Sequence, residues 1–191
     1  MRGRAEARLT AVARTSPRLA RVRVTAQRAS AMQNAGACYV ELGKYSQALP
    51  QLLDAMTLWE ELGFQLETIR TGRRLATIHL KTGHLDAGIA KLEETYRALQ
   101  ALGVVNESSL ARMEAAEALL AAGRPQTVPN LLRDVAFNFA AEGMMRNARI
   151  ALAYLHEALA SGRVSSDVVR HVRAYLEDLP AHPSARFSPL Q

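Results

Sequence analysis

The chain has 191 residues, of which 49% are hydrophobic and 22% charged, a balance typical of a folded protein and not of a chain that is disordered throughout. The single cysteine excludes an internal disulfide and any zinc site built from several cysteines. No uncharged apolar run approaches the roughly 18 residues that span a bilayer, so we expect no membrane segment.

The net charge of +6 is concentrated at the N-terminus. Residues 1–28 hold eight arginines and one acid, whereas the rest of the chain holds 16 basic and 17 acidic residues. Such an arm attracts nucleic acid or an anionic surface, and its composition is also typical of a transit peptide. Because the chain has only three lysines and uses arginine throughout, we favour a solvated helical segment. No apolar run marks a secretory signal, so the cytoplasm is the default location.

Glycines recur every 20 residues through the middle of the chain, and this ladder predicts its architecture. Between the glycines, apolar residues such as Leu49, Leu52 and Met56 follow the three-and-four spacing of an amphipathic helix. A glycine just after a helix supplies the left-handed residue that ends it. No segment alternates apolar and polar residues as a strand does, so the expected fold class is all-α. The ladder comprises Gly43, Gly63, Gly83, Gly103, Gly123 and Gly143, with Gly162 one residue early.

The same patterns predict seven main helices and a closing one. Ser46 is expected to cap the second helix, and Ser165 or Ser166 the last. Pro17 argues against a complete helix before residue 18. Three prolines and two serines mark residues 180–191 as a flexible tail. The main helices are predicted over 18–42, 46–62, 65–82, 85–102, 106–122, 127–142 and 144–161, and the closing helix over 166–178.

The first helix pair carries a family pattern. Met32, Ala35, Gly36 and Tyr39 precede the run Gly-Lys-Tyr-Ser-Gln-Ala at 43–48, and Leu52 and Ala55 follow it. This pattern resembles the tetratricopeptide repeat, although the unit here has 40 residues and the usual one has 34. The later units keep parts of the pattern in the same register, namely Leu75, Ala76, Gly83 and Leu92, and then Ala115, Ala116, Gly123 and Leu132.

The resemblance implies a right-handed solenoid of antiparallel helix hairpins, with three 40-residue repeats and a C-terminal capping pair. It divides the chain into a basic N-terminal arm (1–28), three repeats (29–143), a degenerate capping pair (144–179) and the tail (180–191). The segment 124–179 also resembles the C-terminal end of large bacterial repeat proteins that carry an N-terminal regulatory domain. The chain is therefore expected to be the tail of a longer regulatory protein or a short relative of one.

We find no constellation for catalysis or for a cofactor. The histidines lack metal-ligand spacing, and His79 takes an aromatic position of the repeat, which predicts a packed imidazole. Cys38 lies within a helix, where a small buried thiol is the expected state. The run Gly-His-Leu-Asp-Ala-Gly at 83–88 lacks the Lys-Ser/Thr pair that grips phosphate, and no set of nucleophile, base and oxyanion donor is evident. We therefore expect no enzyme activity, no metal and no cofactor.

The family resemblance implies a partner groove lined by the first helix of each hairpin, so the leading interpretation is a protein–protein interaction scaffold. Thr77 stands where the carboxylate clamp of some family members needs asparagine, so a C-terminal carboxylate is not implied. The expected partner is a peptide or helix with apolar residues and acids. The alternative function is nucleic-acid binding through the arginine arm. The groove residues implied are Gln33, Val40, Glu41, Arg70, Arg73, Thr77, Leu80, Lys81, Met113, Glu117 and Leu120.

Overall fold

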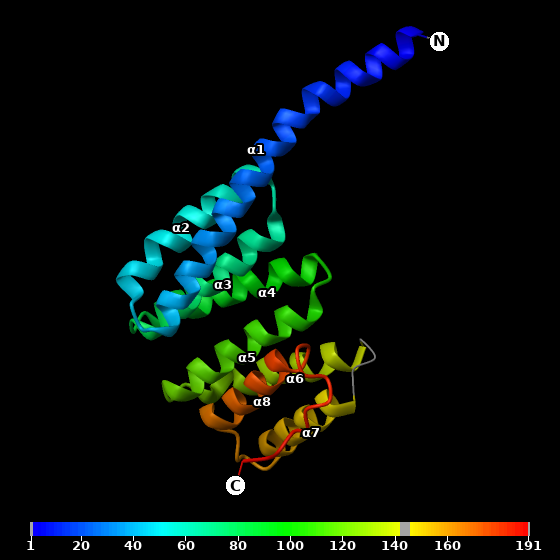
Figure 1. Ribbon diagram of the computed structural model, residues 1–191. Coiled ribbons are helices and arrows are strands. Elements are labelled where there is room, and N and C mark those ends of the chain that lie inside the picture. Colours follow the sequence, from blue (N-terminus) through cyan, green and yellow to red (C-terminus); the bar gives the residue numbers. More distant parts are fainter. Residues whose placement is uncertain (1, 142–145, 191) are drawn as a thin grey trace. The chain divides into compact units, whose positions relative to one another are not determined.

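The computed structural model describes residues 2–141 and 146–190, and within these ranges the chain is helical and has no strand (Figure 1). The all-α fold class is thereby confirmed. The chain divides into two compact units, Met1–Ile78 (unit 1) and His79–Gln191 (unit 2). Gly143 and the first residues of the predicted helix 144–161 lie outside the described residues.

Helix boundaries agree with the sequence prediction to within two residues, except at the N-terminus. There the helix begins at Arg2 and continues through Pro17, so the prediction that it starts at residue 18 was wrong. Good helix formers, chiefly alanine and arginine, flank the proline on both sides, and an interior proline can kink a helix without ending it. The elements are α1 (Arg2–Glu41), α2 (Tyr45–Leu62), α3 (Gln65–Lys81), α4 (Leu85–Ala101), α5 (Val105–Ala121), the 3₁₀ turn η1 (Pro125–Thr127), α6 (Val128–Ala141), α7 (Arg146–Ala160) and α8 (Ser166–Asp178).

The ladder glycines end their helices as predicted. Six of them have φ between 68° and 84°, in the left-handed region. The residue after the glycine then donates its N–H to a carbonyl five positions back, which is the longer bond of a Schellman turn. Three such bonds, each 2.8 Å long, recur at 40-residue steps, from Lys44 to Tyr39, from His84 to His79 and from Arg124 to Leu119.

The predicted caps gave two different outcomes. Ser46 is not a cap, because α2 begins one residue before it and Lys44 precedes the helix without a side-chain cap bond. The Ser165 prediction is confirmed, since its hydroxyl accepts from the Val168 N–H at 3.3 Å. Burial follows the same 40-residue register as the turns, with Leu52, Leu92 and Leu132 all 3% exposed or less.

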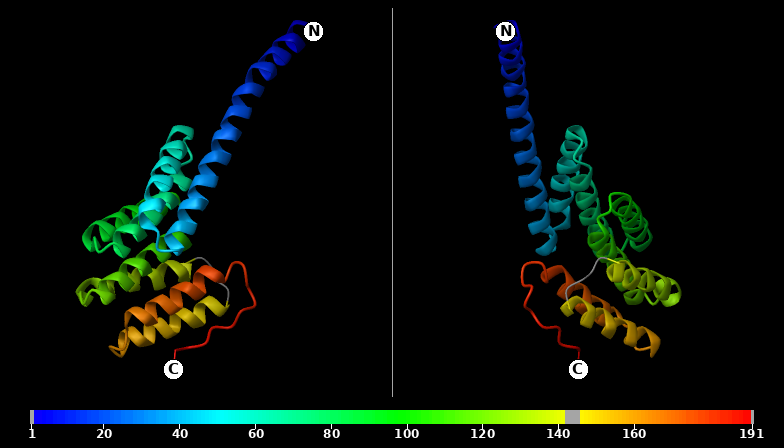
Figure 2. Two further views of the ribbon diagram at one scale, coloured as in Figure 1. Left: turned by 60° about the vertical axis from the view of Figure 1, so that its left-hand side comes forward. Right: turned by 90° about the vertical axis from the view of Figure 1, so that its right-hand side faces the viewer.

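In unit 1, α1 and α2 form a hairpin whose helices approach closely at Gly36. A Cβ atom at Gly36 would lie 2.6 Å from Leu52 Cγ, so the leucine of α2 packs directly on the backbone of α1. Leu52 forms the core of this unit together with Ala48, Leu75 and Ile78. The 40-residue helix α1 is much longer than the 18-residue α2, and its N-terminal part extends beyond it (Figure 2).

In unit 2, α5 is the central helix and packs against α4, α6 and α8. Helix α8 lies between α5 and α7 (Figure 1). The core draws on all four helices from α5 to α8 and includes fully buried Met113, Val135, Val169 and Val172.

Residues 180–190, predicted as a flexible tail, instead return alongside α7 and α8 (Figure 2). The ring of Phe187 packs against Tyr154, His171 and Tyr175 at centroid distances of 5.1–5.4 Å. A half-buried aromatic anchor therefore holds a segment whose prolines and serines indicated a free end.

Candidate partner-binding surfaces

A buried polar junction joins the three helices of unit 1. The Gln33 Oε1 atom on α1 accepts from Trp59 Nε1 on α2 at 2.7 Å and from the Thr71 hydroxyl on α3 at 3.2 Å. The indole nitrogen can only donate, so the amide oxygen of Gln33 must face it. All three side chains are buried, which holds α1 against both α2 and α3.

Two of the predicted groove residues are part of the packing itself. Gln33 is 8% exposed and its amide oxygen is engaged in the junction, and Met113, two repeats later in the same register, is fully buried in the core of unit 2. Their side chains offer a partner no surface, so their assignment to the groove is corrected. The place that they share in the repeat is one where a neighbouring helix packs.

The other predicted residues of unit 1 lie on α1 and α3. Glu41 is exposed, and Val40 is half-buried against the small core around Leu52. The Arg70 Nη1 atom lies 2.7 Å from Glu67 Oε1 on the same helix, and the Arg70 side chain remains 39% exposed. Arg73 and Thr77 are half-buried, and the Thr77 hydroxyl donates to the Arg73 carbonyl at 3.3 Å.

The predicted groove residues Leu80 and Leu120 mostly pack against other residues of unit 2. Leu80 covers Gly88 so closely that a Cβ atom there would lie 2.5 Å from the leucine Cδ2. Leu120 packs against the core of unit 2, whereas Lys81 is exposed. Both leucines are therefore largely taken up by packing, Leu80 against α4 and Leu120 against the core of unit 2.

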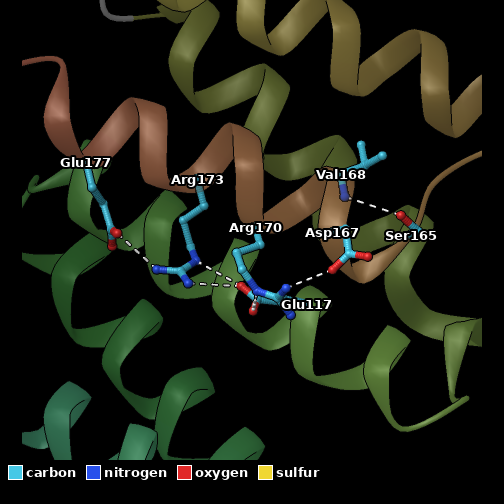
Figure 3. A network of polar contacts seen from close by, with 7 residues as sticks. All are labelled: Glu117, Ser165, Asp167, Val168, Arg170, Arg173 and Glu177. Carbon is cyan, nitrogen blue, oxygen red and sulfur yellow. Dashed lines mark hydrogen bonds and ion pairs between the residues drawn. The ribbon is translucent and has the colours of Figure 1, made fainter. Parts of the chain in front are cut away.

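Glu117, the last predicted groove residue, is held by α8 of the same chain (Figure 3). One of its oxygens accepts from Arg170 Nε at 2.7 Å, and the other accepts from Arg173 Nη2 at 2.9 Å. The arginines extend the network to Asp167 at 2.7 Å and to Glu177 at 3.0 Å. With its side chain only 13% exposed, Glu117 is a docking point for an internal helix.

The same ion pairs set the charge state of the two arginines. The hydrogen bond and the attraction of Glu117 raise the pKa of Arg170 above its ordinary value. Burial lowers the pKa of Arg173, but the attraction of Glu177 and the hydrogen bond to Glu117 outweigh it and leave the pKa raised. Both guanidinium groups therefore stay charged, and the link between α5 and α8 is a charged one at every pH near neutrality.

Four arginines of α1 form a second candidate surface. Arg18, Arg21, Arg23 and Arg28 are exposed, and within the part of the chain whose side chains are described no carboxylate pairs with them. Leu19 and Val24, on the same stretch, are 65% and 62% exposed. This stretch is a positively charged helix surface, with four exposed arginines and no ion pair to any of the described side chains.

The histidine and cysteine predictions are settled in part. His79 is half-buried and meets His84 edge-on at 6.2 Å between ring centroids. Cys38 is exposed, so the expectation of a buried thiol was wrong; the core side of α1 at this level is taken by Gly36 and Val40 instead. Among the described side chains, no three His, Cys, Asp or Glu residues come together as metal ligands. None of the described helices has the length and apolarity needed to cross a membrane.

Comparison of the chain with models of protein families, with curated proteins and with solved structures finds no match.

Proposed function

We propose that the chain is a protein-binding scaffold, a right-handed solenoid of three 40-residue hairpins closed by α7 and α8, which resembles the tetratricopeptide repeat. Its partner segment, a peptide or a helix, would lie across α1 and α3 of unit 1. The observation that carries this proposal is the Gln33 junction, because it fixes α1 beside α3. Val40 packs against the same small core as Leu75 of α3, the helix that bears the basic pair Arg70 and Arg73.

The contact between α8 and α5 supports this choice of face. Glu117 and Thr77 are 40 residues apart and occupy the same place in the repeat, and at Glu117 the chain accepts a helix through two arginines. Where α5 carries the acid, α3 carries Arg70 and Arg73 around Thr77. A partner for α3 would therefore carry acids where α8 carries arginines, together with an apolar residue to meet Val40.

The test is a charge reversal with a matched control. The Arg70→Glu, Arg73→Glu variant changes the net charge by four, and so does Arg133→Glu, Arg149→Glu on exposed positions of α6 and α7. A partner captured from the source cell is titrated against each by calorimetry, with circular dichroism as the check on folding. We expect at least tenfold weaker binding for the first variant and a change below about twofold for the control, tenfold being about 1.4 kcal/mol. Intact folding with unchanged affinity would place the site elsewhere.

The exposed arginines of α1 favour a second candidate function, binding to the phosphates of nucleic acid. Arginine suits phosphate because its planar fork of donors matches the oxygens of that group. A 20-base-pair labelled duplex is titrated with the chain between 50 and 200 mM salt. Phosphate contacts would lower the affinity steeply with salt, and replacing Arg18, Arg21, Arg23 and Arg28 by glutamine would weaken binding and reduce its salt dependence. A salt-independent affinity, or one that the four substitutions leave unchanged, would exclude this function.

A further inference from the structure

The returning C-terminal segment makes a set of contacts that differs from the helix packing elsewhere in unit 2. After α8 the chain turns at residues 178–185, where backbone bonds run from Ala181 to Asp178 and from Ala185 to His182, each 3.0 Å long. Residues 185–190 then continue without helix, and Phe187 enters the ring cluster of Tyr154, His171 and Tyr175. A piece of chain without regular secondary structure thus lies against side chains of two helices, α7 and α8.

Two side chains of α8 hold the backbone of this segment. The Tyr175 hydroxyl donates to the Ala185 carbonyl at 2.9 Å, and His171 Nε2 lies 2.7 Å from the Ser188 carbonyl oxygen. A carbonyl can only accept, so the proton of the His171 ring is on Nε2. His171 and Tyr175 are one helical turn apart, and their bonds reach carbonyls on either side of Phe187. Bonds to carbonyls do not depend on the side chains of the segment that they hold.

The ring of Phe187 is the only large side chain that the segment commits to the surface. Arg186, Ser188, Pro189 and Leu190 are exposed, whereas Ala185 and Phe187 are half-buried. The contacts that hold the segment are thus one aromatic ring and two backbone carbonyls. Bonds to the backbone combined with one side-chain anchor are a mode by which proteins recognise peptides.

We propose that the cluster of Tyr154, His171 and Tyr175 is a peptide-binding site for an extended, phenylalanine-bearing segment of a partner protein, and that the chain's own residues 185–190 close it. Occupation by the tethered segment is intramolecular, with an effective concentration of about millimolar for a short linker. A partner peptide must displace it, so the tail sets a threshold for binding. This proposal uses residues of unit 2 that the α1 and α3 surface does not include. The peptide site and the proposed α1–α3 partner surface can therefore fail independently of one another.

The experiment uses the full chain and a fluorescein-labelled peptide with the sequence of residues 182–190, His-Pro-Ser-Ala-Arg-Phe-Ser-Pro-Leu. Fluorescence anisotropy is measured with the unaltered chain and with Phe187→Ala, which empties the ring cluster but leaves its three rings in place. We expect the variant to bind the peptide at least tenfold more tightly than the unaltered chain. A peptide with alanine in place of phenylalanine should bind neither chain, and adding His171→Ala to Phe187→Ala should weaken binding again.

A second variant guards against a Phe187→Ala chain that fails to fold. Pro180→Gly, Pro183→Gly loosens the turn and keeps every residue of the site, so it lowers the effective concentration of the tail and should raise the peptide affinity several-fold. Absence of peptide binding to either variant, with helicity intact, would overturn the proposal, as would equal binding of the two peptides. One further outcome is a concentration-dependent dimer that Phe187→Ala abolishes. That result would overturn the proposal that the occupant comes from a different protein, because the tail of a second copy of this chain would then occupy the ring cluster.

Discussion

Replacing Gln33 by leucine tests how unit 1 holds its three helices together. Leucine keeps much of the volume of glutamine but removes the oxygen that accepts from Trp59 Nε1 at 2.7 Å. The Thr71 hydroxyl also loses its 3.2 Å contact, yet it keeps a shorter bond of 2.8 Å to the Glu67 carbonyl. The indole N–H is therefore the one donor left without an acceptor. A buried donor in that state costs about 1–3 kcal/mol, which is the expected loss in the free energy of unfolding.

Trp59 is the single tryptophan of the chain, so its fluorescence reports the unfolding of unit 1 in a urea titration. Thr71→Val is the matched control, because it removes a longer contact and orphans no indole, and it should cost less than about 1 kcal/mol. Circular dichroism, followed in the same titration, shows whether unit 2 unfolds with unit 1. A Gln33→Leu chain with the midpoint of the unaltered chain, or one no less stable than Thr71→Val, would refute the reasoning.

Three further predictions concern the turns, the link between α5 and α8, and the tail. Gly43 has a φ of 69° and nothing lies within 4 Å of the place for a Cβ atom, so Gly43→Val should cost about 1–3 kcal/mol from backbone strain alone and Gly43→Asn distinctly less; equal thermal midpoints for the two would contradict this. Glu117→Gln should lower the free energy of unfolding by about 1–3 kcal/mol, because it removes the charge that Arg170 and Arg173 share. The loss stays in this range because the two arginines keep Asp167 and Glu177 as partners. A loss of stability that 1 M salt does not reduce would argue against an ionic contact. Burial raises the pKa of Tyr175, so the neutral phenol contributes stability that is complete below about pH 10 and is lost as the pH rises through the folded pKa. When tyrosine absorbance is titrated with base, the last phase should disappear in Tyr175→Phe. Loss of an earlier phase instead would show that another tyrosine titrates last.

The fold could be predicted from the sequence because its strongest signal is local. A glycine after each helix needs only its own backbone to adopt a positive φ, and the 2.8 Å bond of the following residue recurs at Gly43, Gly83 and Gly123. The start of α1 could not be predicted in the same way, because Pro17 weighs against a helix locally, whereas the residues on both sides favour one.

The candidate groove was predicted less well, because helix spacing shows which residues share a face but not what covers that face. Gln33, Met113 and Glu117 follow the spacing of a partner surface, yet a neighbouring helix of the same chain meets each of them or buries it. The sequence does carry a signal for the ring cluster at the C-terminus. Aromatic residues are only 5% of the chain, and Phe187 stands alone in a tail of prolines and serines.

The 40-residue register relates the polar junction of unit 1 to an apolar counterpart and predicts how the junction can be removed. Positions 33, 59 and 71 correspond to 113, 139 and 151, where the chain has Met, Phe and Ala, so the later repeat has an apolar version of the same three residues. Met113 and Ala151 are fully buried, as Thr71 is, and the Phe139 side chain lies outside the described ones.

A polar group in such a place is stable only together with its partners, and replacing all of them by apolar groups can be nearly neutral. We therefore expect Gln33→Met to cost about 1–3 kcal/mol in the unaltered chain, because it orphans the Trp59 N–H. In a chain that already carries Trp59→Phe and Thr71→Ala, the same substitution should be neutral or stabilising, since the amide of Gln33 would there be the buried group without partners. Circular dichroism in urea measures both steps. Equal costs in the two backgrounds would mean that the three residues are not energetically coupled and that the contact at 2.7 Å contributes nothing specific to unit 1.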